Sequence, residues 1–175
     1  MKTNVAIIGF MGVGKSTVGK LLAKKLGKQY VETDSLIVKR VGKSIPQIFK
    51  EDGEIAFREL EIEIIKELAL KEGQVIDCGG GVVLNKINID RLKQSSIVVW
   101  LTASPLAIAR RTSFDGHGRP LLNYKNDITS IRSLLHERKL FYELASEIEV
   151  NTTGKSVELV VNKIIERLKQ HEDFY

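Results

Sequence analysis

Nine residues near the N-terminus have the types and the spacing that phosphate chemistry needs. Residues 9–17 read GFMGVGKST, which fits the phosphate-binding pattern G-x-x-x-x-G-K-[ST] at every fixed position. Glycines let the backbone of such a loop approach an anion, and the N–H groups at the start of the following helix point at it. The pattern therefore predicts that Lys15 reaches the β- and γ-phosphates of a nucleotide and that the Ser16 hydroxyl ligates Mg²⁺.

The residues around this phosphate loop, residues 9–17, favour the same interpretation. An apolar run over residues 5–8 leads in and predicts a strand, and an amphipathic run leads out and predicts a helix. The alternative is a glycine-rich turn that binds nothing, and the strand before and the helix after make it the weaker interpretation. A dinucleotide-binding G-x-G-x-x-G pattern starting at Gly12 is excluded, because position 17 is Thr17.

Two carboxylates lie at the end of a second predicted strand, residues 29–33. Glu32 and Asp34 are spaced i, i+2, so on a strand their side chains would point to the same face. Such a pair suits a Mg²⁺ shell or the recognition of hydroxyl groups in a crevice at the carboxyl edge of a parallel sheet. Alternatively, Asp34 caps the helix that we expect to begin near Ser35.

Two arginines lie on predicted helices where they need an anionic partner. Arg58 is in the first turn of a helix predicted over residues 54–71, where Glu54 is placed to form a surface pair with it. Arg138 falls within the apolar stripe of a helix predicted over residues 127–145, so it needs an internal carboxylate or an acidic substrate.

Two glycine-bearing segments complete the candidate site. Residues 79–81 are three glycines directly after a predicted strand, where they permit close approach by a ligand or form a turn to the next helix. Asp77, in that strand, could support a bound metal ion. Residues 112–124 show no periodicity and hold Arg119 among glycines and a proline, which favours a lid that delivers Arg119 to the site.

The elements that must position these residues alternate along the chain. Predicted strands and helices alternate about five times, which indicates an α/β protein with a parallel sheet covered on both faces. The strands are expected at residues 5–8, 29–33, 75–78, 95–102 and 148–151. No repeat, linker or low-complexity segment interrupts this pattern, so the 175 residues are expected to form a single domain.

Composition and charge exclude several classes of protein. Of the formal charge of +5, residues 1–30 contribute six lysines and no acid, and the other residues carry 21 basic and 22 acidic side chains. The excess positive charge thus lies beside the phosphate loop, which argues against a nucleic-acid-binding protein. The single cysteine, Cys78, excludes an internal disulfide framework. No apolar run is long enough to span a membrane and Lys15 interrupts the one leader-like run, so a soluble cytoplasmic protein is expected.

Together these motifs resemble the shikimate kinases, of the nucleoside-monophosphate-kinase-like group. The matching segments are GFMGVGKST at 9–17, T-D at 33–34, D-G-E-x-x-F-R at 52–58, GGG at 79–81, R-P-L at 119–121 and R-x-x-x-Y at 138–142. The resemblance implies a three-layer α/β/α P-loop kinase fold with a five-stranded parallel sheet. It further implies a substrate-binding helical region at about 33–61 and a mobile lid at about 112–124.

The resemblance also implies an activity and a substrate site. A monomeric enzyme would use ATP and Mg²⁺ to convert shikimate into shikimate 3-phosphate on the pathway to chorismate and the aromatic amino acids. Asp34 would hold the ring hydroxyl groups and accept the proton of the attacking one. Arg58 and Arg138 would bind the substrate carboxylate, and Gly80 and Gly81 would line the ring.

For ATP, the resemblance implies that Arg119 descends from the lid onto the phosphates and that Arg110 borders the adenine. The residues implied to bind ATP in the phosphate loop are Gly12, Val13, Gly14, Lys15, Ser16 and Thr17. In one place the chain departs from the family, which usually has D-x-D where this sequence reads Glu32-Thr33-Asp34. The first acid is implied to act on Mg²⁺ through water, and Glu32 keeps its charge on a side chain one methylene longer.

Two other functions stay open at this point. Another small-molecule P-loop kinase, such as a gluconate kinase, would also have the loop, the lid and acid-binding arginines. It is expected to lack the combination of D-G-E-x-x-F-R and GGG. A non-catalytic guanine-nucleotide switch would need the motif N-K-x-D, whereas residues 85–88 read N-K-I-N and lack the final acid.

Overall fold

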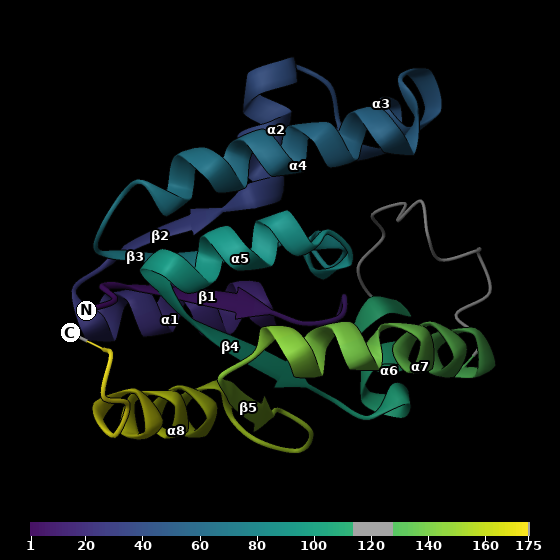
Figure 1. The fold of residues 1–175 in the computed structure, drawn as a ribbon. Coiled ribbons are helices and arrows are strands. Elements are labelled where there is room, and N and C mark those ends of the chain that lie inside the picture. Colours follow the sequence, from purple (N-terminus) through teal and green to yellow (C-terminus); the bar gives the residue numbers. More distant parts are fainter. Residues whose placement is uncertain (114–127, 175) are drawn as a thin grey trace.

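In the part of the chain that the structure describes, five parallel strands form one sheet in the order β2-β3-β1-β4-β5 (Figure 1). The structure is a computed structural model that describes residues 1–113 and 128–174. The strands are β1 (Asn4–Ile8), β2 (Gln29–Glu32), β3 (Gln74–Asp77), β4 (Ser96–Thr102) and β5 (Ile148–Asn151). The helices are α1 (Lys15–Leu26), α2 (Thr33–Val41), α3 (Ile45–Glu51), α4 (Gly53–Ala69), α5 (Lys86–Ser95), α6 (Pro105–Ser113), α7 (Ile128–Ala145) and α8 (Val157–Lys169).

The strand β1 lies in the middle of the sheet, where Ile7 pairs with Asp77 of β3 and with Val99 of β4. Its four apolar residues are fully buried, because helices cover both faces of the sheet. In an open parallel sheet, ligands bind at the carboxyl ends of the strands, at the point where the strand order reverses. The phosphate loop follows β1 directly, so it begins at the centre of that edge.

Helices form a layer on each face of the sheet. Alternate residues of a strand point to opposite faces, so Val5 and Ile7 pack with residues of α1 and α8, whereas Ala6 and Ile8 pack with residues of α4 and α5. This arrangement confirms the predicted three-layer α/β/α fold with a five-stranded parallel sheet. No helix in residues 1–113 or 128–174 combines the length and apolarity needed to cross a membrane.

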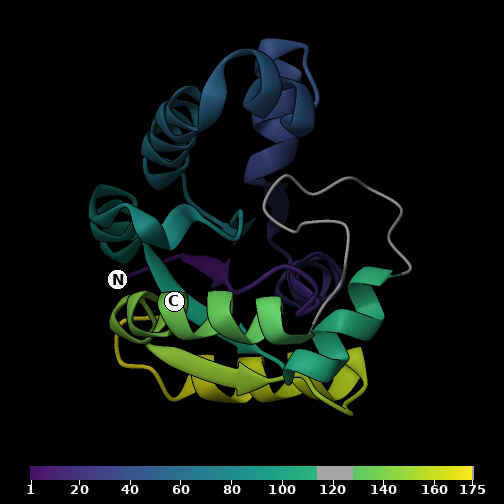
Figure 2. The same cartoon turned by 90° about the vertical axis from the view of Figure 1, so that its right-hand side faces the viewer.

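Helices α2, α3 and α4 stand together on one side of the molecule, across from α6 and α7 (Figure 2). The short helix α3 is fixed at its start by a capping box, in which the Ser44 side chain accepts from the backbone N–H of Gln47 and the Gln47 side chain accepts from that of Ser44. Pro46 occupies the first turn, where its missing N–H costs nothing. This group of helices forms the wall that faces the phosphate loop.

The junction between β2 and α2 differs from the sequence-based expectation. The strand ends at Glu32 and the helix begins at Thr33, whereas we expected a strand over residues 29–33 and a helix from near Ser35. The Thr33 side chain accepts a hydrogen bond from the backbone N–H of Gly79 at 2.9 Å, which ties the junction to the end of β3. Asp34 therefore lies in the first turn of α2 and does not cap it, so both the i, i+2 strand pairing with Glu32 and the capping role are wrong.

One aromatic pair fixes α7 against the sheet. Trp100 of β4 and Tyr142 of α7 stack with ring centroids 5.6 Å apart and an interplanar angle of 11°. Offset stacking of this kind adds to the free energy gained by burying the two rings. The pair sets the rotation of α7 about its axis, and with it the direction in which Arg138, one turn earlier, projects.

Candidate active site

A cleft of about 640 Å³ lies at the carboxyl edge of the sheet. The phosphate loop, the ends of β2 and β3, and side chains from α2, α3, α4 and α7 line it. Most of the predicted site residues share this cleft: Gly12, Gly14, Lys15, Ser16, Thr17, Glu32, Asp34, Arg58, Gly80, Gly81 and Arg138. Residues more than a hundred positions apart in the sequence thus meet in one place.

Three predicted site residues stand outside this group. Val13 is 1% exposed, and its side chain packs in the core and does not line the cleft. Arg110 is exposed in the last turn of α6 and is not part of the cleft lining. Arg119, with residues 114–124 of the predicted lid, lies outside the described residues.

The phosphate loop has the conformation that anion binding needs. Gly12 and Gly14 have φ angles of 77° and 100°, a region that favours glycine. Helix α1 begins at Lys15, and the first N–H groups of a helix have no partners within it. The Lys15 ammonium lies back over the loop and donates to the carbonyls of Gly9 and Phe10 at 3.0 and 3.2 Å. Positive charge and the N–H groups at the start of α1 therefore converge where a phosphate would bind.

An arginine that the sequence did not single out braces this loop. Arg111 donates from Nη1 to the carbonyls of Gly12 and Val13, both at 3.2 Å, and to Thr152 Oγ1 at 3.1 Å. Thr152 in turn donates to the Val13 carbonyl at 2.9 Å. The end of α6 and the segment after β5 thus hold the loop together. In the sequence, Arg111 was indistinguishable from its neighbour Arg110, because only the fold shows which one turns inward.

Asp34 sits between the phosphate loop and the end of β3. Burial raises the pKa of its carboxyl group, and the positive charge of Lys15 opposes that rise. Within the described residues, its buried Oδ1 atom has no hydrogen-bond donor. A Cβ atom at Gly79 would lie 2.7 Å from that oxygen, so only glycine leaves the carboxylate its room. The Asp34 side chain also lines the cleft, where a carboxylate is suited to accept a hydrogen bond from a ligand hydroxyl group.

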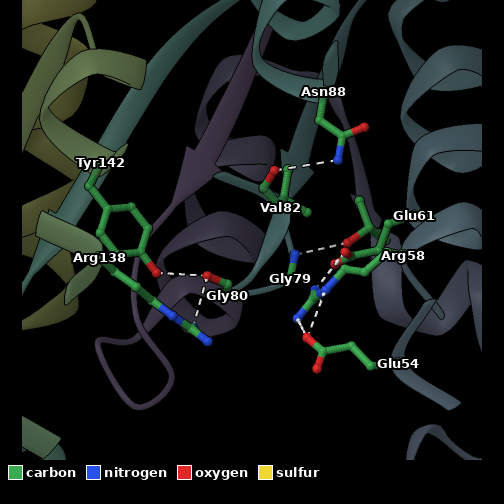
Figure 3. Close-up of polar contacts among 10 residues, drawn as sticks. Glu54, Arg58, Glu61, Gly79, Gly80, Val82, Asn88, Arg138 and Tyr142 are labelled. Carbon is green, nitrogen blue, oxygen red and sulfur yellow. Dashed lines mark hydrogen bonds and ion pairs between the residues drawn. The ribbon is translucent and has the colours of Figure 1, made fainter. Parts of the chain in front are cut away.

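Arg58 crosses the cleft wall between two acids of its own helix (Figure 3). Nη2 pairs with the exposed Glu54 at 3.1 Å, as the surface-pair interpretation predicted, and Nη1 pairs with the buried Glu61 at 2.6 Å. Arg58 also lines the cleft, so the surface pair with Glu54 does not withdraw it from the site, and its contact with a ligand stays a prediction. Glu61 was not predicted, although it stands three residues after Arg58 on the buried face of α4.

Arg138 and Tyr142 approach the three glycines from the opposite side, on α7 (Figure 3). Tyr142 donates to the Gly80 carbonyl at 2.7 Å, and Arg138 donates to the same oxygen at 3.4 Å. Arg138 is 6% exposed, and its guanidinium lies 5.7 Å from the centre of the Phe10 ring. Among the described residues, no carboxylate forms an ion pair with it. The internal partner that was one alternative is therefore not found there, and a buried cation faces the cleft.

The contact between Arg58 and Gly81 leads to a first prediction. A Cβ atom at Gly81 would lie 2.3 Å from Arg58 Nη1 and 2.7 Å from its Cζ, so an alanine must displace the guanidinium. We expect Gly81→Ala to raise the KM of the acceptor substrate by about tenfold or more, because a charged hydrogen bond is lost, with little change in the KM of the nucleotide. Steady-state kinetics with both substrates varied would measure this.

The matched control for this prediction is the same change in an Arg58→Ala background. If Gly81→Ala acts by moving Arg58, it should have almost no further effect once the guanidinium is gone. A full tenfold effect in both backgrounds would instead mean that the new methyl group itself blocks the substrate.

A second prediction concerns the buried acid Glu61. Burial raises its pKa to about 7 from 4.5, despite the opposing charge of Arg58. The folded protein then binds more protons at this site than the unfolded chain does between these two values. The free energy of unfolding should therefore fall as the pH rises through this window, by at most about 1.4 kcal/mol per pH unit. Glu61→Gln cannot ionise, so it should flatten the dependence.

Urea unfolding at several pH values between 5 and 7 would test this prediction. The control is Glu54→Gln, which removes the exposed partner of the same arginine and should keep the wild-type slope. Identical slopes for the wild type and Glu61→Gln would contradict the prediction.

Oxygen ligands suited to Mg²⁺ are present in the cleft. Ser16, Glu32 and Asp34 all line it, and hydroxyl and carboxylate oxygens are what this hard cation prefers. Within the described residues, no group of three or more His, Cys, Asp or Glu side chains is placed to hold a metal by itself. This donor set fits Mg²⁺, which usually takes few protein ligands and fills its shell with water and substrate phosphates.

Fold and site together first define a class of protein. A phosphate loop after the central strand of a β2-β3-β1-β4-β5 sheet, with a cleft at the carboxyl edge, is the architecture of P-loop kinases of the nucleoside-monophosphate-kinase-like group.

Comparison with known proteins then identifies the family. The family model described as shikimate kinase matches residues 11–169. Shikimate kinase from Geobacter sulfurreducens is 44% identical over 169 residues, covering 97% of this chain and 92% of the relative. The one from Pelotomaculum thermopropionicum is 42% identical over 168 residues, covering 96% of both. The structure of shikimate kinase from Acinetobacter baumannii in complex with shikimate has a TM-score of 0.92 and 32% identity, covering 99% of this chain and 96% of that one. The chain belongs to the shikimate kinase family.

Proposed function

We propose that this chain transfers the γ-phosphoryl group of ATP to the 3-hydroxyl group of shikimate, giving shikimate 3-phosphate and ADP. The observation that carries the proposal is the arrangement around the glycines at 79–81. Arg58 and Arg138 approach them from opposite walls of the cleft that also holds Asp34 and the phosphate loop. This arrangement matches a small acid that has a carboxylate to be gripped and hydroxyl groups to be oriented.

On the substrate side, Arg58 and Arg138 bind the carboxylate and fix the ring against the backbone of Gly80 and Gly81. Asp34 accepts a hydrogen bond from the attacking hydroxyl group and takes its proton as the new O–P bond forms. The raised pKa of Asp34 makes it a better proton acceptor than an exposed aspartate. This division of roles places the nucleophile within reach of the loop that holds the phosphates.

On the nucleotide side, the N–H groups of the phosphate loop and Lys15 bind the phosphates of ATP. ADP is released from the same loop after the transfer. Phosphoryl transfer needs chiefly positioning and charge neutralisation, which these groups supply. Ser16 would hold Mg²⁺, with Glu32 contributing through water, and the bound ion would neutralise charge on the phosphate oxygens. Arg119 and Arg110 keep the roles at the phosphates and the adenine that the family resemblance implies.

The proposal also covers the domain organisation, the oligomeric state and the cellular location of the protein. The chain acts as one P-loop kinase domain and as a monomer, with residues 33–61 as the substrate-binding region and residues 112–124 as the lid. It works in the cytoplasm, as supported by its single cysteine, Cys78, which is buried and free.

A coupled assay of ADP release tests the proposal. Shikimate, gluconate and nucleoside monophosphates would be supplied in turn as acceptors, and the product would be analysed by ³¹P NMR for the position of the phosphate. Of these acceptors, we expect only shikimate to give turnover, and we expect the product to carry the phosphate on its 3-hydroxyl group. Faster turnover with gluconate would instead support the alternative, a sugar-acid kinase of the same fold.

A further inference from the structure

Asp77 is a buried acid in the site to which the proposed function gives no role. It is the last residue of β3, where it pairs in register with Ile7 of β1 and with Glu32 of β2, and it is 3% exposed. Side chains alternate along a strand, and Val75, two residues earlier, packs on the face covered by α1. The Asp77 carboxylate therefore points toward the N-terminus of α1, beneath the phosphate loop.

Two hydroxyl groups donate to the same carboxylate oxygen. Ser16 Oγ donates to Asp77 Oδ2 at 2.7 Å, and the Tyr30 hydroxyl donates to it at 2.8 Å. A serine hydroxyl has one proton and two lone pairs. Because Asp77 takes the proton of Ser16, the hydroxyl keeps its lone pairs for a cation. Tyr30, anchored in β2, holds Oδ2 in place for this contact.

The neighbouring acid Glu32 makes a different contact. One of its carboxylate oxygens accepts a hydrogen bond from Ser35 Oγ at 2.7 Å, on the outer side of the β2–α2 junction. Glu32 also lines the cleft, but among the described residues it has no hydrogen bond to the Ser16 hydroxyl. Of the two acids in register on β2 and β3, the one that contacts the expected metal ligand is therefore Asp77.

We propose that Asp77, locked by Tyr30, is the positioning residue that orients the Ser16 hydroxyl toward Mg²⁺ and supplies the principal protein carboxylate beside the ion, with Glu32 secondary. This inference rests on the proposed use of Mg²⁺ at Ser16. It accounts for how a chain with Glu32 at the first acid position can still support the ion: the negative charge comes from the adjacent strand. Support from a carboxylate behind a metal ligand typically changes metal affinity by about 10–100-fold.

The test measures metal binding to the full chain without any acceptor substrate. Mn²⁺ serves as the probe, and its affinity for the complex of the protein with ADP is measured by electron paramagnetic resonance. The affinity for ADP alone is measured by calorimetry in EDTA. We expect Asp77→Asn to weaken Mn²⁺ binding about tenfold or more, with ADP binding in EDTA changed by less than about threefold. Glu32→Gln should weaken Mn²⁺ binding by less than about threefold.

Tyr30→Phe supplies a second variant, because it removes one donor and leaves all charges in place. It should weaken Mn²⁺ binding by a few-fold and also leave ADP binding in EDTA unchanged. Asn at position 77 can still accept from both hydroxyl groups, and thermal melting would verify that each variant is folded. If Asp77→Asn fails to fold, the Tyr30→Phe result decides, and a wild-type Mn²⁺ affinity there overturns the proposal.

The proposal is also overturned if Asp77→Asn binds Mn²⁺ as the wild type does, or if Glu32→Gln causes an equal or larger loss. A uniform loss of ADP binding with and without metal would mean that Asp77 only shapes the loop, and it too would overturn the proposal. None of these readouts needs shikimate to be the substrate. Failure of the proposed function and failure of this inference are therefore distinguishable.

Discussion

Replacing Lys15 by alanine is expected to lower kcat by about a thousandfold or more. The Lys15 ammonium lies over the phosphate loop and, among its contacts, donates to two loop carbonyls. A bound nucleotide would supply phosphate oxygens at this place, and negative charge would build up on the leaving oxygen of ADP as its bond to the γ-phosphorus breaks. A cation fixed there acts mainly on the transition state, which is why its loss should appear in kcat more than in nucleotide affinity.

Single-turnover kinetics with saturating ATP would separate this effect from a change in binding. The matched control is Lys24→Ala, which removes an exposed lysine from the same helix and should leave turnover unchanged. Burial raises the pKa values of Asp34 and Asp77, and the positive charge of Lys15 opposes that rise by stabilising both carboxylates. Its loss should therefore also reduce stability near neutral pH, and melting must be checked first. Wild-type kcat in a folded Lys15→Ala protein would refute the phosphate-loop assignment.

Replacing Asp34 by asparagine should produce the second large loss, about a hundredfold to ten-thousandfold in kcat. Asparagine has nearly the same shape and can still form hydrogen bonds with a substrate hydroxyl group, so the KM for shikimate should change only a few-fold. It cannot accept a proton. The loss should therefore fall on the chemical step, as expected for a residue that touches the reacting oxygen.

The pH dependence of kcat/KM provides a further test of Asp34 as the base. Burial raises the pKa of Asp34, and the proposed base must be ionised, so wild-type kcat/KM should fall as the pH drops through that raised value. The low residual activity of Asp34→Asn should not show this fall at low pH. Asp90→Asn, on the exposed surface of α5, is the control and should keep both the rate and the fall at low pH. An unchanged profile in Asp34→Asn would assign the proton to another group.

The fold was largely predictable because its signals are local. Buried parallel strands appear as short apolar runs, and β5 was predicted with the bounds that the structure has. The start of α2 was not, because what ends β2 is a hydrogen bond from Gly79 to Thr33, between residues 46 positions apart. A pattern within one segment carries no information about such a contact. Asp34 was therefore predicted in the wrong element, since it lies in the first turn of α2, but it does line the cleft at the carboxyl edge of the sheet.

Most residues of the recognisable motifs were predicted to share one site and do line the cleft, whereas the residues that hold them in place were not predicted. Arg58 and Arg138 stand out because a cation beside an apolar stripe needs a partner. Glu61, Arg111 and Tyr30 look like ordinary helix and strand residues in the sequence. Their partners lie on the same helix face, on a distant loop, or on a neighbouring strand, so only the assembled sheet shows what they hold.

The stack of Trp100 on Tyr142 has a spectroscopic consequence. Trp100 is the one tryptophan in the sequence, and only 9% of it is exposed. Its ring lies against the tyrosine that binds the Gly80 carbonyl in the cleft. Any ligand that shifts Gly80 or rotates α7 changes the surroundings of a single chromophore. Intrinsic fluorescence, excited at the red edge where tyrosine does not absorb, can thus follow occupancy of the substrate side of the cleft in the unlabelled protein.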